Sequence, residues 1–124
     1  IRITVSGTSE PITGSISEIT ILTYNLIDNA IRHASEPDKR VTVTVSGDEK
    51  IRLDVRDYGA GIDPGELLHI WEKYYTSRQR GHKGVSGLGL AIVKQIAAIH
   101  QAETAVESHP GEGSKFSLIL DRSL

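Results

Sequence analysis

The chain has 124 residues, a formal net charge of −2 and no cysteine. This length favours one domain, which would bury roughly two-thirds of the surface of its unfolded chain. The composition excludes disulfides and thiolate metal sites, the charge gives no overall attraction for nucleic acid, and no apolar run reaches the roughly 20 residues that span a bilayer. Because the chain begins at Ile1 without a methionine, we interpret it as a piece of a longer protein or as a processed product.

The first elements in chain order are a strand and a long helix. Alternating apolar residues predict a short strand at residues 2–6. Apolar residues at helical spacing then predict a helix that Ser15 or Ser17 can cap and that runs to about Ala34.

The next segments alternate with the period of a strand. Residues 41–45 and 51–55 predict two strands, which Gly47 and Asp48 join through a turn. A loop and a short helix at residues 64–69 are expected to follow.

The second half begins with a long segment that has no apolar period, residues 74–86. A loop of this length in a compact domain is usually functional or disordered. Residues 88–100 predict a second long helix, and residues 104–107 and 115–120 predict two strands joined by a turn. This order of elements indicates helices packed on one face of a mixed or antiparallel sheet.

Two asparagines of the first helix share a face. Asn25 and Asn29 are four residues apart, and the same stripe continues through Arg32 and His33. Asparagine is unfavourable inside a helix by roughly a few tenths of a kcal/mol relative to alanine, so two on one face suggest a function. Their amide oxygens suit Mg²⁺ and phosphate, because Mg²⁺ takes hard oxygen ligands and water. A solvated polar face is the alternative interpretation.

An aspartate ends the third predicted strand and enters a glycine turn. The carboxylate of Asp57 can accept a hydrogen bond from an exocyclic amine such as that of adenine. Gly59 and Gly61 let the backbone approach a planar ligand closely. Aspartate and glycine are also the usual residues of an ordinary turn, which is the alternative.

A second glycine segment opens the second long helix. Gly87 and Gly89 flank Leu88 at this point, where free N–H groups and the helix dipole favour a phosphate. In the basic loop before it, Arg78 or Lys83 could neutralise a triphosphate. Glycine required only for packing, and charge that is merely solvated, are the alternatives.

Five segments in this order resemble the motifs of the catalytic and ATP-binding domain of sensor histidine kinases, a branch of the GHKL (Bergerat) superfamily. Residues 25–33 resemble the N box, residues 57–62 the first glycine box and residues 71–75 the F box. Residues 86–94 resemble the second glycine box and residues 111–116 the closing glycine segment. Each segment is modest alone, but five in register are highly specific.

The resemblance implies an α+β fold. This is a two-layer α/β sandwich (the Bergerat fold) with a mixed sheet of about five strands, about three helices on one face and a flexible ATP lid. Asn25 and Asn29 would hold Mg²⁺ and phosphate, and Arg78 would contact the γ-phosphate; these are the expected catalytic residues. Asp57 would bind the adenine amine. The expected nucleotide-binding set is Asn25, Asn29, Arg32, His33, Asp57, Gly59, Gly61, Ile62, Tyr75, Arg78, Gly87, Leu88 and Gly89.

The resemblance also implies an activity, which is transfer of the γ-phosphoryl group of Mg²⁺-ATP to a histidine on a separate dimerisation domain. Hydrolytic members and anti-sigma serine kinases carry a glutamate where Asn25 stands, which disfavours both alternatives. None of the five histidines precedes Glu or Asp, as a phosphoacceptor usually does, so the acceptor is expected elsewhere. An ATP-sensing or inactive kinase-like module is the second hypothesis.

The expected setting follows from the same resemblance. Residues 1–124 would form one catalytic domain in the cytoplasmic part of a dimeric two-component sensor kinase. Its partners would be ATP, the histidine-containing domain of the parent chain and a downstream response regulator, with no nucleic acid.

Overall fold

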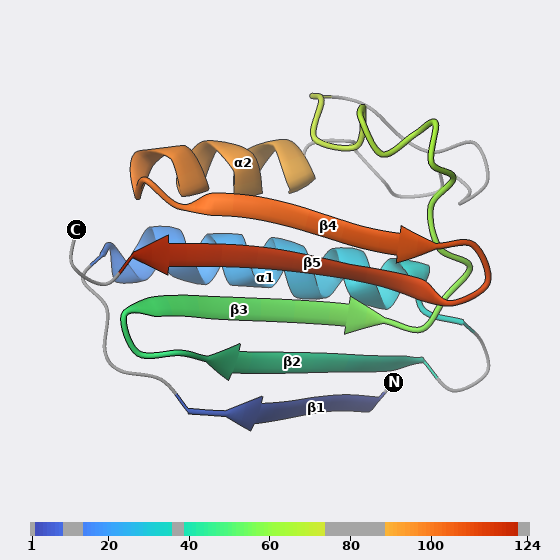
Figure 1. Cartoon of the computed structure of the whole chain (residues 1–124), viewed down its shortest axis with the longest axis horizontal. Helices are drawn as coiled ribbons and strands as arrows, with labels where there is room; N and C mark the ends of the chain where they lie inside the picture. Colours follow the sequence, from blue (N-terminus) through green and yellow to red (C-terminus); the bar gives the residue numbers. More distant parts are fainter. Residues whose placement is uncertain (1, 9–13, 36–38, 74–88, 122–124) are drawn as a thin grey trace.

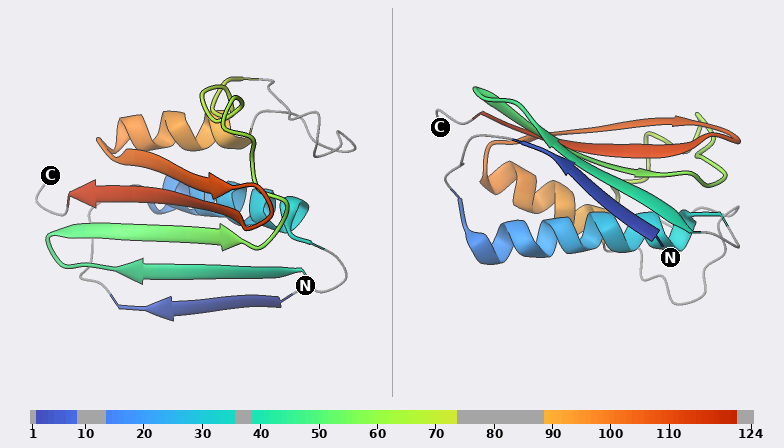
Figure 2. Two further views of the ribbon diagram at one scale, coloured as in Figure 1. Left: turned by 45° about the vertical axis from the view of Figure 1, so that its right-hand side comes forward. Right: turned by 90° about the horizontal axis from the view of Figure 1, so that it is seen from below.

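A computed structural model describes residues 2–8, 14–35, 39–73 and 89–121 of the chain. These residues form two layers, in which two helices lie on the same face of a five-stranded sheet (Figure 1 and Figure 2). The strands are β1 (Arg2–Gly7), β2 (Arg40–Ser46), β3 (Lys50–Asp57), β4 (Glu103–His109) and β5 (Gly113–Asp121), and the helices are α1 (Ile16–His33) and α2 (Gly89–Ile99).

The sheet is mixed. Its strand order is β1-β2-β3-β5-β4, with β1 parallel to β2 and every other neighbouring pair antiparallel. The expected α+β sandwich with about five strands is therefore confirmed.

The first helix begins at a side-chain cap. Ser15 has an extended backbone, and its Oγ accepts a hydrogen bond from the N–H of Glu18 at 3.2 Å. This bond satisfies one of the amides that a helix start leaves without a partner. Leu22, Leu26 and Ala30 are each at most 1% exposed and form the buried stripe that the sequence predicts. The helix ends within one residue of its predicted end.

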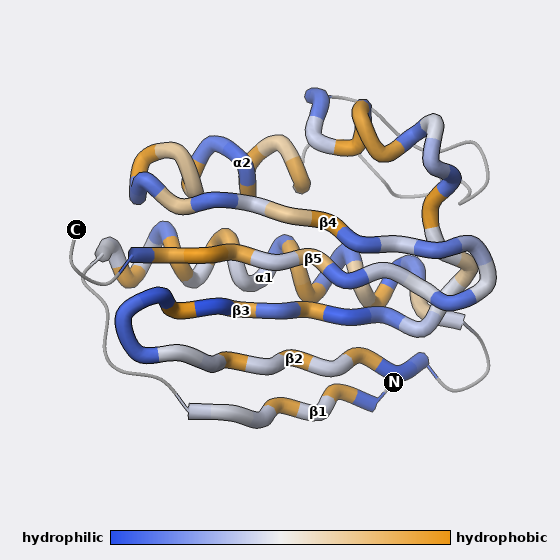
Figure 3. The backbone as a smooth tube through the Cα atoms, viewed as in Figure 1, coloured by the Kyte–Doolittle hydropathy of each residue, from blue (hydrophilic) through white to orange (hydrophobic). Residues whose placement is uncertain are grey.

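The core lies between the helices and the inner face of the sheet. Val43, Val55 and Phe116 are opposite one another across β2, β3 and β5, and all three are buried. Apolar and polar residues alternate along β2 (Figure 3). This alternation places one face in the core and leaves the other in water.

The predicted short helix at residues 64–69 is wrong. This segment forms successive turns, in which the N–H of Glu66 donates to the carbonyl of Asp63 and the N–H of His69 to that of Glu66, both at 2.9 Å. A helix of so few residues gains little from propagation, and Gly65 makes it less favourable. The expected count of about three helices is therefore two within the described part of the chain.

Candidate functional site

The expected site residues that the structure describes lie on the second half of α1 and on segments packed beside it. The end of β3 lies beside the end of α1, toward the right of Figure 1, whereas Gly89 at the start of α2 lies against Asn25 in the middle of α1. In the right view of Figure 2, the start of α2 lies over the middle of α1, while α1 and β3 end farther to the right. Segments far apart in the sequence therefore meet along the second half of α1.

Asp57 is the last residue of β3 and is completely buried, with 0% of its surface exposed. Its Oδ1 accepts a hydrogen bond from the N–H of Gly59 at 2.9 Å. An aspartate in an ordinary surface turn keeps its carboxylate in water, because burial of a charge is expensive without specific partners. The burial of Asp57 therefore favours the functional interpretation of this glycine turn.

The two glycines after Asp57 have no room for a side chain. A Cβ at Gly59 would overlap the carbonyl oxygen of His33, at the end of α1. Gly61 has a φ of +81°, and a Cβ there would overlap the carbonyl oxygen of His109. Their close packing joins the first glycine box to α1 on one side and to the end of β4 on the other.

The N box and the second glycine box also meet. The Nδ2 of Asn25 donates to the carbonyl of Ile21 at 2.8 Å. Its Oδ1 lies against the first residue of α2, because a Cβ at Gly89 would be only 3.1 Å from that oxygen. An amide oxygen is thus held beside a helix start, where free N–H groups attract anions.

Asn29 carries a buried polar atom that the fold does not satisfy. Its Nδ2 is buried and has no hydrogen-bond partner among the described residues. Such a group costs about 1–3 kcal/mol unless a ligand satisfies it. A 180° turn of the amide would bring the oxygen to the same place, as a hard ligand for Mg²⁺ requires.

The donor set fits Mg²⁺ better than a metal held by the protein alone. The described residues contain no group of three or more His, Asp or Glu side chains that could hold an ion. Mg²⁺ typically uses one or two protein oxygens together with water and substrate phosphates. Asn25 and Asn29 are suited to that arrangement.

Some of the remaining expected nucleotide-binding residues are described by the structure, and others lie outside the described residues. Arg32 is exposed and donates to Asp28 at 2.8 Å along α1, while the backbone of His33 abuts Gly59. Ile62 is 2% exposed and its side chain belongs to the core. Tyr75, Arg78, Gly87, Leu88 and the expected lid at residues 74–86 lie outside the described residues.

Trp71 is partly buried and packs against the hydrophobic core. Its ring meets that of Phe116 edge to face, with ring centroids 5.7 Å apart. The ammonium of Lys94 on α2 lies 5.5 Å from the Trp71 centroid. The F-box segment is thereby attached to both layers.

Sequence reasoning did not single out Ser108. This buried serine of β4 accepts a hydrogen bond from the N–H of Ile62, 46 positions earlier in the chain, at 2.7 Å. A serine near a strand end has no local pattern that indicates such a contact. Only the pairing of β4 with β5 brings it to the glycine loop.

Comparison with known families agrees with this geometry. Residues 14–124 match the family described as histidine kinase-, DNA gyrase B- and HSP90-like ATPase. The chain belongs to this family. The match includes both asparagines of α1, Asp57 and all the glycine segments, so the resemblance seen in the sequence is confirmed.

Several relatives of this ATPase-family chain are sensor kinases. Sensor histidine kinase RppB of Synechocystis sp. is 39% identical over 110 residues, which cover 86% of this chain and 24% of RppB. Phosphate regulon sensor protein PhoR of Pseudomonas aeruginosa is 36% identical over 108 residues, which cover 84% of this chain and 24% of PhoR. The chain thus spans about a quarter of the length of these relatives.

The fold also matches a solved structure. The mycobacterial sensor histidine kinase MprB superposes with a TM-score of 0.84 at 29% identity, covering 96% of this chain and 83% of that chain. Within the described residues, no helix has both the length and the apolar character needed to cross a membrane.

Proposed function

We propose that the chain is the ATP-binding catalytic domain of a two-component sensor histidine kinase. It binds Mg²⁺-ATP along the second half of α1, between the end of β3 and the start of α2, and it supplies the γ-phosphoryl group to a histidine on a separate dimerisation domain. The observation that carries the proposal is that α1 brings distant segments together, with Gly59 and the buried Asp57 at His33 and with Gly89 at Asn25. Family membership and the sensor-kinase relatives support it.

Each described residue has a specific part in this proposal. Asp57 accepts a hydrogen bond from the adenine amine, and the backbone at Gly59 and Gly61 lies against the base. Asn25 and Asn29 hold Mg²⁺ and phosphate oxygens. Bound Mg²⁺ would neutralise the charge of the transferring phosphoryl group.

The expected γ-phosphate contact belongs to the lid. Arg78 supplies a guanidinium, whose fork of donors suits a phosphate. Together with the N–H groups at the start of α2, it would position the terminal phosphate.

Transfer is favoured over hydrolysis by the chemistry of one side chain. The side chain of Asn25 is a neutral amide whose nitrogen donates a hydrogen bond to the carbonyl of Ile21. Such an amide cannot take a proton from water. Phosphoryl transfer needs mainly positioning and charge neutralisation from its enzyme. A phosphate-binding site with a neutral amide at the position of Asn25, instead of a general base, is suited to transfer the phosphoryl group to a nucleophile on another domain.

The proposed setting is a longer protein. Residues 1–124 would be one domain of a dimeric sensor kinase and would act on its cytoplasmic side, upstream of a response regulator. The fact that the chain spans about a quarter of RppB and PhoR supports this setting.

The binding part of the proposal is tested by calorimetric titration with the non-hydrolysable ATP analogue AMP-PNP in magnesium buffer. Asp57→Asn should weaken binding about tenfold or more, because a charged acceptor of the adenine amine is lost. Asp54→Asn is the matched control, since Asp54 lies on the same strand but bonds Arg52 and Ser117 instead. Equal affinity of the two variants for AMP-PNP would show that Asp57 does not bind the adenine amine.

The transfer part requires the parent's helical domain. Incubation of this chain and the helical domain with radiolabelled ATP should give acid-labile phosphate on the helical domain. Tight binding of ATP without transfer would instead indicate an ATP-sensing module. Steady phosphate release by the chain alone, lost in Asn29→Ala, would indicate a hydrolase.

A further inference from the structure

Two hydrogen bonds join the glycine loop at residues 59–62 to the β4–β5 hairpin. The N–H of Gly111 donates to the carbonyl of Ala60 at 2.7 Å. The N–H of Ile62 donates to the Oγ of Ser108, also at 2.7 Å. The first bond is made by backbone alone, whereas the second depends on one side chain and can be removed by mutation.

The hydroxyl of Ser108 is fully used. Besides accepting from Ile62, it donates to the carbonyl of Gly113 at 3.0 Å and lies 2.8 Å from the Oγ of Ser114. One donor hydrogen and two acceptor positions are all that a serine hydroxyl has. Because Ser108 and Ser114 are both buried, water cannot replace these contacts.

Ser108 also lies in one buried row with the aspartate of the site. It is opposite Ser114 in the β4–β5 pair, and Ser114 is opposite Asp57 in the β3–β5 pair. A Cβ at Gly113 would overlap the carbonyl oxygen of Asp57, so the hairpin and the end of β3 are in tight contact. Ser108 therefore connects the loop after Asp57 to the strands that hold Asp57 itself.

We propose that Ser108 is a positioning residue for the nucleotide-base pocket. It holds the loop at residues 59–62 in place relative to the Asp57 carboxylate, so that both face the same base. This inference rests on the proposed function and adds a determinant of base selectivity that touches no ligand. Pockets that are formed before binding bind more tightly, because less ordering is required on association.

The effect of losing the hydroxyl is expected to be local. Ser108→Ala leaves the N–H of Ile62 buried without an acceptor, and such a group is unfavourable enough for the loop to shift. The strand ladder between β4 and β5 is made by backbone groups, which the substitution does not alter. Base recognition should therefore suffer more than folding does.

The test is a calorimetric comparison of the 124-residue chain with Ser108→Ala and Ser117→Ala, at a temperature where thermal melts show all three folded. Ser117 is the matched control, a buried serine whose hydroxyl bonds Asp54 and Arg52 instead of the glycine loop. The probes are AMP-PNP and GMP-PNP, which differ only in the base.

For Ser108→Ala we expect an affinity for AMP-PNP about tenfold lower and a preference for AMP-PNP over GMP-PNP that falls by a similar factor. Ser117→Ala should change both by less than about twofold. A merely structural role would weaken both nucleotides equally, and that result would overturn the inference. If Ser108→Ala does not fold, the same comparison is made with Ser108→Cys. The cysteine sulfur is of similar size to the serine hydroxyl but is a weak hydrogen-bond acceptor.

The outcomes separate this inference from the proposed function. Binding by the unmodified chain, with Ser108→Ala or Ser108→Cys unaffected, would overturn the inference alone. Absence of AMP-PNP binding by the unmodified chain would overturn the proposed function and this inference with it.

Discussion

The side-chain oxygen of Asn25 lies against the first residue of α2, at a distance that leaves Gly89 no room to become alanine without a shift. The Cβ of an alanine would be 3.1 Å from Asn25 Oδ1. The amide of Asn25 is also held through its nitrogen, because Nδ2 donates a hydrogen bond to the carbonyl of Ile21. This pair is a direct contact between the N box and the second glycine box.

Gly89→Ala should therefore weaken nucleotide binding with little change in stability. Alanine favours the helix by up to about 1 kcal/mol, and this gain offsets the strain of moving Asn25. The displaced amide should lower the affinity for AMP-PNP about tenfold. Calorimetry and urea denaturation measure the two effects. Gly65→Ala is the control, because a Cβ there meets nothing within 4 Å, and equal affinities in the two variants would contradict the prediction.

Gly59→Ala tests the other close contact of the site. The new methyl group would overlap the carbonyl oxygen of His33, which is backbone and cannot move aside cheaply. We expect a loss of about 2 kcal/mol or more in the free energy of unfolding, as for other overpacked positions. Urea denaturation measures it. A loss no larger than that of Gly65→Ala would show that the loop and α1 are not held together here.

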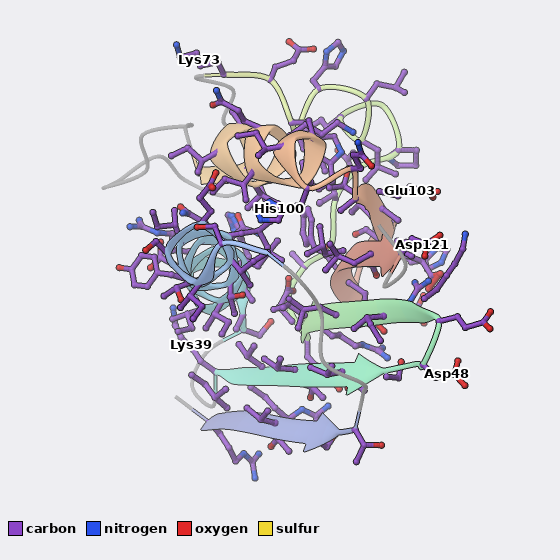
Figure 4. All side chains as sticks on the ribbon, turned by 90° about the vertical axis from the view of Figure 1, so that its left-hand side faces the viewer. Lys39, Asp48, Lys73, His100, Glu103 and Asp121 are labelled. Atoms are coloured by element: carbon purple, nitrogen blue, oxygen red, sulfur yellow. The ribbon has the colours of Figure 1, made fainter. Side chains whose placement is uncertain are left out.

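His100 joins the end of α2 to the start of α1. Its Nε2 accepts a hydrogen bond from the N–H of Ser15 at 3.2 Å, and its Nδ1 is 3.0 Å from the carbonyl of Ile96. Figure 4 shows His100 between the ends of the two helices. His100→Ala should therefore lower the free energy of unfolding by about 1–2 kcal/mol.

Thermal or urea denaturation checks this loss. His69→Ala is the control, because the His69 side chain is 51% exposed and pairs with Glu72 at the surface, where such pairs contribute at most about 1 kcal/mol. A smaller effect at His100 than at His69 would contradict the predicted link.

Two residues after the end of α2, a residue other than glycine has a left-handed backbone. Gln101 has a φ of +55°, and the N–H of Ala102 donates to the carbonyl of Ala97 at 2.8 Å. This conformation is unfavourable for any residue with a Cβ. Gln101→Gly should raise the free energy of unfolding by roughly 0.5–1 kcal/mol.

The same substitution at Gln95, inside α2, is its control. There glycine should lower the free energy of unfolding by about 1 kcal/mol, because it is a poor helix former. Changes of the same sign at both positions in urea denaturation would refute the explanation.

Much of the fold could be read locally. Ser15 and the stripe at Leu22, Leu26 and Ala30 predict α1, because the cap and the 3.6-residue period are properties of neighbouring residues. The strands follow in the same way from their two-residue period. The segment at residues 64–69 was the exception, since a few residues around Gly65 do not determine a helix.

The sequence by itself determined the five strands, the two long helices, their order and the family, because periodicity, caps and glycine motifs are properties of short segments. The tertiary structure alone decided that Asp57 is fully buried, that Asn25 meets Gly89 and that Ser108 holds Ile62. The burial of Asp57 and both contacts depend on residues that are far apart in the chain. Their geometry depends on how strands pair and helices pack, which no local pattern specifies.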